Sequence, residues 1–304
     1  MTRSKPASNI AKQALAKYVL VKPILVALAL LATTSFSYAQ TIKVAVASNF
    51  LSTAKILKPL FEEEMAEKAT TLKESPHTIQ IISASTGQLS HQILNGAPFD
   101  VFLSANKSHA VTVKEQLKLA DDLLFKYTQG SLVLISNKAL KSLPDIQSSL
   151  KQVLASGSPV QTISQELQAN IIQKVLVSAN KVAIANAKIA PYGLATEELL
   201  SNLNLSNRIK DKTVKGQNIA QTYQFFTSGS ADAAFVARSH WLQTNKQASY
   251  AAKSSINIST HLHNPIEQWG LVVNDTEASR AFQAFMLQPH IQAIMKNNGY
   301  GTDQ

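Results

Sequence analysis

The chain of 304 residues contains no cysteine. This absence excludes a disulfide framework, a zinc site built on thiolates, a cysteine nucleophile and a lipid-anchored N-terminal cysteine. Charged residues are also few, at 16% of the chain, whereas hydrophobic residues make up 45%. Such a composition is typical of globular proteins and differs from that of disordered chains. A length of about 300 residues suits one large domain or two lobes.

The sequence also lacks the motifs of common enzyme classes. It contains no G-x-S-x-G elbow, no Walker loop, no G-x-G-x-x-G and no H-E-x-x-H. Among seven histidines, only His261 and His263 resemble a metal-binding pair, and no carboxylate stands close to them in the sequence. We interpret this pair as part of a solvated loop. An enzyme is therefore not expected, although an exported hydrolase of unknown type is kept as an alternative.

Acidic residues are fewer than basic ones, 19 against 29, but much of the difference lies at the N-terminus. Residues 1–39 contain five basic residues and no acidic one, so the rest of the chain has a net charge of +5. This mild charge gives no support to nucleic-acid binding. A short apolar run at 24–32 and the ending Ser37-Tyr38-Ala39 complete the pattern of a cleavable secretory signal peptide. The sequence therefore predicts export to the periplasm.

Strand and helix patterns alternate along the predicted mature chain. Strands are expected at 42–46, 79–82, 99–103, 131–136, 181–185, 233–236 and 269–273. Polar turns and helical patterns follow several of these strands, which is typical of βαβ units with a parallel sheet. Two such sets predict two lobes, the first formed by residues 40–127 and 262–304 and the second by residues 128–261. Residues 1–39 are the signal peptide, and residues 142–178 form a helical segment rich in Ser and Gln.

Four turns that carry hydroxyl, amide or glycine residues precede predicted helices. They are Ser48-Asn49, Ser85-Thr86-Gly87, Pro191-Tyr192-Gly193 and Gly216-Gln217-Asn218-Ile219. The first turn of a helix leaves main-chain N–H groups unpaired and carries a partial positive charge, so oxyanions bind there readily. Each turn by itself is more often an ordinary helix cap. The turns alone therefore do not establish a binding site.

The amino-acid sequences of these turns resemble those of the periplasmic molybdate-binding proteins of ABC importers. The similar segments are Val44–Phe50, Ser83–Gly87, Gly96–Ala105, Ile184–Asn186, Ala190–Gly193, Gly216–Phe225 and Tyr300-Gly301. The resemblance covers residues 42 to about 301. It implies an α/β fold of the type II periplasmic binding proteins: two lobes, each a mixed, mostly parallel sheet flanked by helices, with two crossing strands and a ligand cleft between the lobes.

The resemblance also implies the ligand and its contacts. The ligand is molybdate or tungstate, with no cofactor and no metal cation, and the partner of the monomeric protein is the membrane permease of an ABC importer. The contacts are Ser48 and Asn49 from the first loop, Ser85 or Thr86 from the second, and the main chain at Tyr192 and Ile219. Thr86 is preferred to Ser85 because it stands directly before the loop glycine. Some relatives have a further tyrosine where this chain has Ala237, and Tyr192 is expected to substitute for that donor.

All these contacts are neutral hydrogen-bond donors. A fully deprotonated tetrahedral dianion has only acceptors, so donors alone satisfy it, whereas monohydrogen phosphate needs an acceptor for its proton. Sulfate has the same charge as molybdate and stays an alternative ligand, because the sequence does not give the size of the cavity. Ferric iron is less favoured, since it needs neighbouring tyrosines and the seven tyrosines are scattered.

Overall fold

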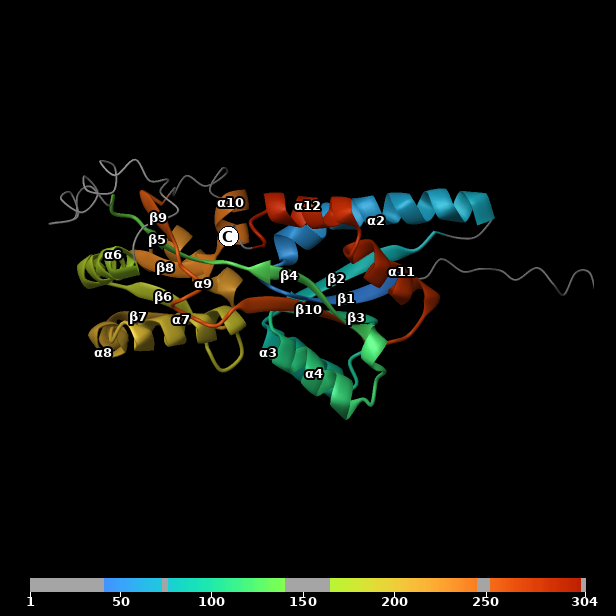
Figure 1. The fold of residues 1–304 in the computed structure, drawn as a ribbon, viewed down its shortest axis with the longest axis horizontal. Coiled ribbons are helices and arrows are strands. Elements are labelled where there is room, and N and C mark those ends of the chain that lie inside the picture. The colour runs from blue at the N-terminus through green and yellow to red at the C-terminus, as the bar shows by residue number, and fades with distance from the viewer. Residues whose placement is uncertain (1–40, 73–75, 140–164, 245–251, 302–304) are drawn as a thin grey trace, which may run out of the picture.

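The computed structural model describes residues 41–72, 76–139, 165–244 and 252–301. The predicted signal peptide lies outside the described residues, as does the part of the Ser/Gln-rich segment before Gln165. The described chain forms two lobes, each with a five-stranded sheet and helices on both of its faces (Figure 1). The predicted fold class is confirmed. Every helix of the described part is too short or too polar to cross a lipid bilayer.

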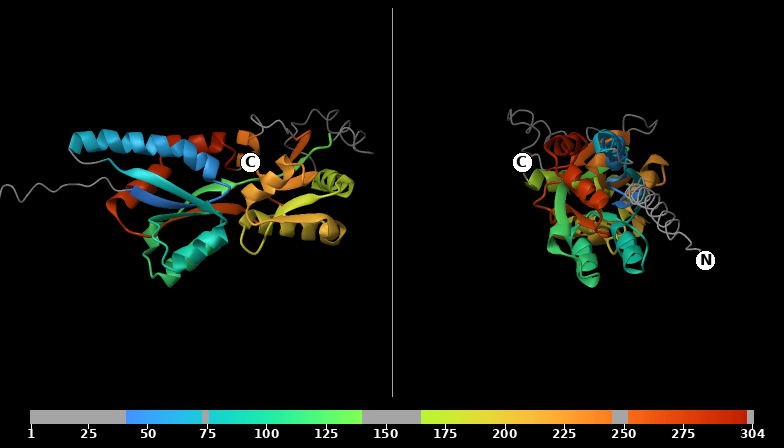
Figure 2. Two further views of the ribbon diagram at one scale, coloured as in Figure 1. Left: turned by 180° about the vertical axis from the view of Figure 1, so that it is seen from behind. Right: turned by 90° about the vertical axis from the view of Figure 1, so that its right-hand side faces the viewer.

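The sheet of the first lobe has the strand order β2-β1-β3-β10-β4. Its strands are β1 (Thr41–Ala47), β2 (Thr78–Ala84), β3 (Val101–Ser104), β4 (Leu124–Gly130) and β10 (Ile266–Val272). β1, β2 and β3 are parallel, and β10 is antiparallel to both of its neighbours. Helices α2 (Leu51–Leu72), α11 (Glu277–Met286) and α12 (Pro289–Asn297) lie on one face, and α3 (Thr86–Leu94) and α4 (Lys107–Gln116) on the other (Figures 1 and 2).

The sheet of the second lobe has the order β7-β6-β8-β5-β9. Its strands are β5 (Leu132–Ser136), β6 (Val182–Ala185), β7 (Thr213–Gly216), β8 (Ala233–Ala237) and β9 (Ser254–Asn257). Its helices are α6 (Gln165–Ser178), α7 (Pro191–Asn202), α8 (Ser206–Ile209), α9 (Ile219–Thr227) and α10 (Arg238–Thr244). β6, β7 and β8 are parallel, and β5 is antiparallel to β8 and β9.

The apolar run of β5 shows why both faces of this sheet are covered. Leu132 and Leu134 pack into a core with α6, α7 and α8, whereas Val133 and Ile135 pack on the other side with α9. Successive side chains of a strand point to opposite faces, so a strand buried on both faces needs an uninterrupted apolar sequence.

Two chain segments connect the lobes. β4 ends at Gly130 and β5 begins at Leu132, so a single residue separates strands of different sheets, and the chain returns through residues 258–265 into β10. The predicted boundary between residues 127 and 128 falls inside β4, because the pairing of β4 with β10 continues to Gly130. The polar residues Thr128 and Gln129 at the end of β4 hid this strand from the apolar pattern.

Some predicted turns are shorter in the structure. Ser83 belongs to β2, Thr86 and Gly87 form the start of α3, and Lys215 and Gly216 end β7. The elements β4, β7, β9, α4, α8, α10 and α12 had not been predicted. The carboxyl ends of β1, β2, β6 and β7 all lead through short loops into helices, which places these four loops beside the junction of the lobes.

Candidate functional site

One small cavity lies where these four loops meet. It has about 190 Å³ of unfilled space, including the part open to solvent. Its lining consists of Ala47, Ser48, Asn49, Ser85, Thr86, Ala105, Ala190, Pro191, Tyr192 and Ile219. All six residues that the sequence analysis selected are therefore brought together around one cavity, and none of them is more than 6% exposed. Their role in binding stays a prediction.

The first loop places Ser48 and Asn49 between β1 and α2. The N–H of Ser48 donates to the carbonyl of Ala84 at 2.9 Å, which ties this loop to the end of β2. The amide Nδ2 of Asn49 donates to Gln268 Oε1 at 2.8 Å and to Tyr300 Oη at 3.3 Å. Asn49 is thus fixed by β10 and by the C-terminal segment.

The main-chain carbonyl of Asn49 is held as firmly as its side chain. It accepts hydrogen bonds from Tyr300 Oη at 2.7 Å and from Ser239 Oγ at 3.1 Å. Because Ser239 lies on α10, this bond joins the first loop to a helix of the second lobe, directly after β8. The position of the loop therefore depends on groups distant in the sequence.

The two hydroxyl groups of the second loop are used differently. Ser85 is the N-cap of α3: its Oγ accepts from Gln88 N at 3.4 Å and donates to Gln88 Oε1 at 2.8 Å. Thr86 Oγ1 accepts from the N–H of Ala105 at 3.1 Å. This bond uses a lone pair and leaves the hydroxyl proton of Thr86 able to donate. The geometry therefore favours Thr86 over Ser85 as a donor toward the cavity.

The second lobe contributes main-chain donors at helix starts. Tyr192 and Ile219 lie in the first turns of α7 and α9, where the helix itself provides no acceptor for the N–H group. Asn218 caps α9 through its side chain, which accepts from Gln221 N at 2.9 Å, whereas Ala190 gives α7 no side-chain cap. The N-terminal ends of α3, α7 and α9 thus face one small space.

The phenol of Tyr192 is buried close to Asn49, and within the described part of the chain no group lies in hydrogen-bonding geometry with its Oη. It packs against Gly130, where a Cβ would lie 2.1 Å from that oxygen, so only glycine fits opposite it. Burial, and then the nearby Tyr300, raise the pKa of Tyr192 well above its usual value, so the phenol stays a neutral donor.

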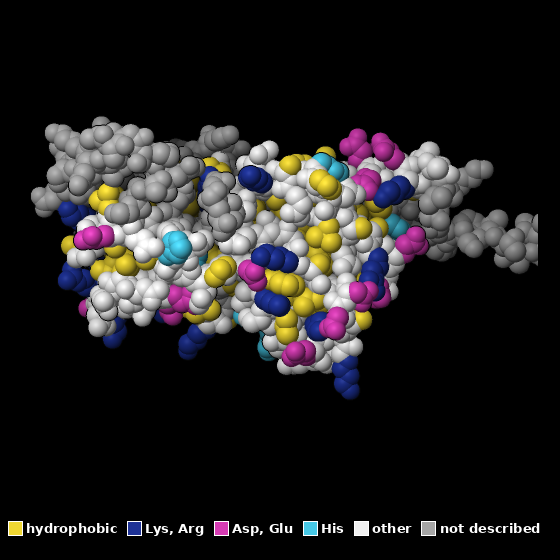
Figure 3. Space-filling model, viewed as in Figure 1, with side chains coloured by type: hydrophobic (Ala, Val, Ile, Leu, Met, Phe, Trp, Pro, Cys, Tyr) yellow, Lys and Arg dark blue, Asp and Glu magenta, His cyan; other side chains and the backbone are white. Residues whose placement is uncertain are grey.

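The electrostatics of the cavity favour an anion. Among the described residues, none that lines it is charged, while the helix N-termini supply partial positive charge. Elsewhere on the face seen in Figure 3, basic and acidic side chains are interspersed over both lobes. The attraction for an anion is therefore local to the cavity and does not depend on a basic surface.

His240 lies directly behind the first loop. It is 5% exposed, its ring is hydrogen-bonded to the main chain of Ser48, and it stacks on Tyr223 with centroids 6.3 Å apart. Burial disfavours the imidazolium and lowers the pKa of His240 to about 4. The residue is therefore a neutral support of the loop at physiological pH.

This buried histidine predicts a loss of stability in acid. An unfolded histidine has a pKa of about 6.5, so between pH 6.5 and 4 the unfolded chain binds a proton that the folded chain does not. The free energy of unfolding should fall there by up to about 1.4 kcal/mol per pH unit. Urea unfolding at a series of pH values from 4 to 8 gives the free energy of unfolding at each pH. Between pH 4 and 6.5 this free energy should depend less steeply on pH in His240→Gln than in the unsubstituted protein. Equal slopes would contradict the assignment to His240.

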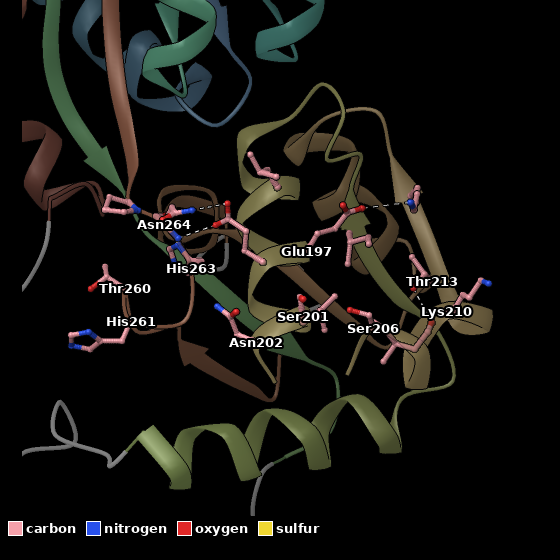
Figure 4. A pocket seen from close by; sticks show the side chains of 17 residues that line it. Glu197, Ser201, Asn202, Ser206, Lys210, Thr213, Thr260, His261, His263 and Asn264 are labelled. Carbon is pink, nitrogen blue, oxygen red and sulfur yellow. Dashed lines mark hydrogen bonds and ion pairs between the residues drawn. The ribbon is translucent and has the colours of Figure 1, made fainter. Parts of the chain in front are cut away.

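A larger pocket of about 1560 Å³, on the same count, lies on the second lobe between α7, α8 and the segment 260–265 (Figure 4). Its lining has both charges, Glu197 and Glu198 with Lys210 and Lys215, and Glu197 forms an ion pair with Lys215 at 3.7 Å. It contains none of the six selected residues, so it is not the candidate site. His261 and His263 also line it. His261 is exposed, as predicted, whereas His263 is only 5% exposed and contacts the carbonyl of Asn264 through Nδ1, which corrects the prediction of a solvated loop for this residue. Within the described ranges, no three His, Asp or Glu side chains gather as a metal site requires.

Gln268, Ser239 and His240 were not selected from the sequence, and Tyr300 was noted only as part of a terminal motif. The one signal was the position of Gln268 in β10: it shares the strand parity of the buried Ile266 and Gly270, so it faces inward. A buried glutamine must find hydrogen-bond partners, which marks it as a candidate for a polar network.

The comparisons with known proteins agree with this geometry. Residues 42–301 match the family described as bacterial extracellular solute-binding protein. The molybdate-binding protein ModA of Azotobacter vinelandii is 30% identical over 266 residues, covering 86% of this chain and 90% of that protein. ModA of Rhodobacter capsulatus is 29% identical, covering 85% and 87%.

A solved structure, the periplasmic molybdate-binding protein of Azotobacter vinelandii, matches with a TM-score of 0.67 at 29% identity. The match covers 86% of this chain and 100% of that one. The family match extends from the first residues of β1 to Gly301, which includes both lobes and the cavity between them. The chain belongs to the bacterial extracellular solute-binding proteins.

Proposed function

We propose that this protein binds molybdate, and tungstate as well, in the cavity between its lobes and delivers the anion to the permease of an ABC importer. The proposed contacts are Ser48, Asn49, Ser85, Thr86, Tyr192 and Ile219. We further propose that the protein acts as a monomer in the periplasm after removal of residues 1–39. Relatives described as molybdate-binding proteins, at 29–30% identity over most of the chain, support this function.

The observation that carries the proposal is the uncharged set of donors around one small cavity. Hydroxyl and main-chain N–H groups match a dianion whose oxygens are all acceptors, while the amide protons of Asn49 are donated to Gln268 and Tyr300 and hold the loop in place. Monohydrogen phosphate is disfavoured because its proton finds no carboxylate among the lining residues. A hydrolase would need a base beside the hydroxyl of Ser48 or Thr86. The described lining contains no histidine, aspartate or glutamate, and the ring of His240 is bonded to the main chain of Ser48.

The two lobes are proposed to close around the anion from opposite sides of the cavity. Sheet pairing groups residues 41–130 with 266–301 and residues 131–257 with each other. An anion that contacts both groups at once binds the closed arrangement more tightly than an open one, which shifts the population toward closure. We expect bending at the junction of β4 with β5 and at residues 258–265.

Isothermal titration of the mature protein with molybdate, tungstate, sulfate and phosphate tests the proposal. Molybdate and tungstate should bind with similar heats and affinities, sulfate more weakly, and phosphate not at all. Sulfate binding more tightly than molybdate would replace the ligand and keep the site. Absence of any heat with all four anions would end the proposal.

Substitution of Thr86 by alanine should weaken molybdate binding by about 1–3 kcal/mol, the usual cost of leaving a buried charged group short of a donor. Thr86→Ser keeps the hydroxyl and should restore most of the affinity. Ser85→Ala should mainly lower stability, by about 1 kcal/mol for a lost helix cap, because its hydroxyl is used within α3. Titration calorimetry and urea unfolding of the three variants separate these effects; a larger affinity loss for Ser85→Ala than for Thr86→Ala would exchange the two roles.

A further inference from the structure

The lobes touch each other directly beside the candidate site. The main-chain N–H of Gly87, on the first lobe, donates to the carbonyl of Ile189, on the second lobe, at 2.9 Å. Gly87 follows Thr86 in the chain, and Ile189 precedes Tyr192 by three residues. The contact therefore joins the two lobes, and in each lobe it lies within a few residues of a proposed donor.

This contact leaves little room for a side chain at position 87. A Cβ there would lie 3.0 Å from Ile189 Cα and 3.2 Å from both the Cβ and the carbonyl oxygen of Ile189. Distances this short are below ordinary van der Waals contact, so one side would have to move. Two of the three atoms belong to the main chain, which a rotamer change cannot displace.

Both partners of the contact are braced within their own lobes. On the first lobe, the capping box of Ser85 and Gln88 and the bond between Thr86 and Ala105 hold the start of α3. On the second lobe, Asn186 O accepts from the N–H groups of Ile189 at 3.1 Å and Ala190 at 2.9 Å, and Asn186 N donates to Gly216 O at 2.8 Å. Neither main-chain segment can therefore shift independently, and steric repulsion at the contact would move the two lobes apart as rigid units.

The lobes also share apolar packing around this point. Ala47 ends β1 and Ala105 directly follows β3 of the first sheet. Both are buried in the core cluster of the second lobe together with Ala190 and Tyr192. Closely packed main chain and small side chains resist further approach, because interiors have few voids and low compressibility.

We propose that the contact of Gly87 with Ile189 is the stop that limits how far the lobes close, and that Gly87 thereby determines the size of the anion that the cavity accepts. The size selectivity rests on the proposed anion-binding function, whereas the stop itself does not. With the stop in place, the distance from Thr86 to the N–H groups of Tyr192 and Ile219 has a fixed minimum. An anion with shorter bonds than molybdate then cannot reach donors of both lobes at good hydrogen-bond length.

The test uses Gly87→Ala and the larger Gly87→Val. Gln92→Ala serves as a matched control. Gln92 is exposed on the same helix, and alanine there introduces the same strong helix former as at position 87. Since the chain has no cysteine, spin labels can be attached at Glu115→Cys on α4 and Asn207→Cys on α8, both exposed and on different lobes. Pulsed electron spin resonance then gives the distribution of distances between the lobes.

The shortest distance that the labelled protein reaches, with or without an anion, should lengthen in Gly87→Ala and lengthen further in Gly87→Val, and stay unchanged in Gln92→Ala. The Kd for molybdate should rise about tenfold in Gly87→Ala, the effect of roughly one lost hydrogen bond, and the Kd of the smaller sulfate should rise by a larger factor. An unchanged shortest distance in both Gly87 variants would overturn the proposal. Absence of anion binding in the unsubstituted protein, with the distances shifted as expected, would refute the proposed function and leave the stop in place.

Discussion

Asn49→Asp is expected to raise the Kd for molybdate at least about a hundredfold, because like charges placed side by side in an interface cost several kcal/mol. Asn49 is buried at the cavity and is fixed by Gln268 and Tyr300, so the new carboxylate cannot turn away toward solvent. It would also lose the amide protons that these two partners accept. Titration calorimetry at pH 8, where the carboxyl group is ionised, measures the effect.

The control for this substitution is Asn49→Ala, which removes the amide without adding charge. It should weaken binding by about 1–3 kcal/mol, the cost of losing a donor or its support. Comparable losses in the two variants would show that repulsion does not matter at this position. Unchanged affinity in both would remove Asn49 from the site.

Phe61→Ala should lower the free energy of unfolding by about 3–5 kcal/mol, the range for a large aromatic side chain removed from a core. Phe61 is fully buried on α2 and meets Phe282 and Phe285 edge to face, with ring centroids 5.3 Å from each. These contacts attach α2 to α11, on the face of the first sheet opposite α3. Urea unfolding measures the loss.

Two comparisons make the Phe61 prediction specific. Ile56→Ala on the same helix, where the side chain is 41% exposed, should change stability by no more than about 0.5 kcal/mol. The fraction of Phe61→Ala that remains folded should bind molybdate as tightly as the unsubstituted protein, because the aromatic cluster does not line the cavity. A large loss of affinity without a loss of stability would contradict both statements.

The alternation of strands and helices could be predicted from the sequence because it depends on local patterns of apolar and polar residues. Apolar runs such as Val44–Val46 and Leu132–Ile135 need only the rule that a buried strand is apolar, and the candidate residues follow such strands directly. Elements with mixed patterns were missed for the same reason: in β4 the polar Thr128 and Gln129 end a strand whose place is set by pairing with β10.

By itself, the sequence determined which loops carry the neutral donors, since strand ends and helix starts are local features that depend on neighbouring residues. Only the tertiary structure decided how those donors are supported, because Gln268 and Tyr300 reach Asn49 across 219 and 251 residues of chain. It also decided how closely the lobes approach, at Gly87 and Ile189. Contacts between distant segments depend on the packing of whole lobes, which no local pattern of residues records.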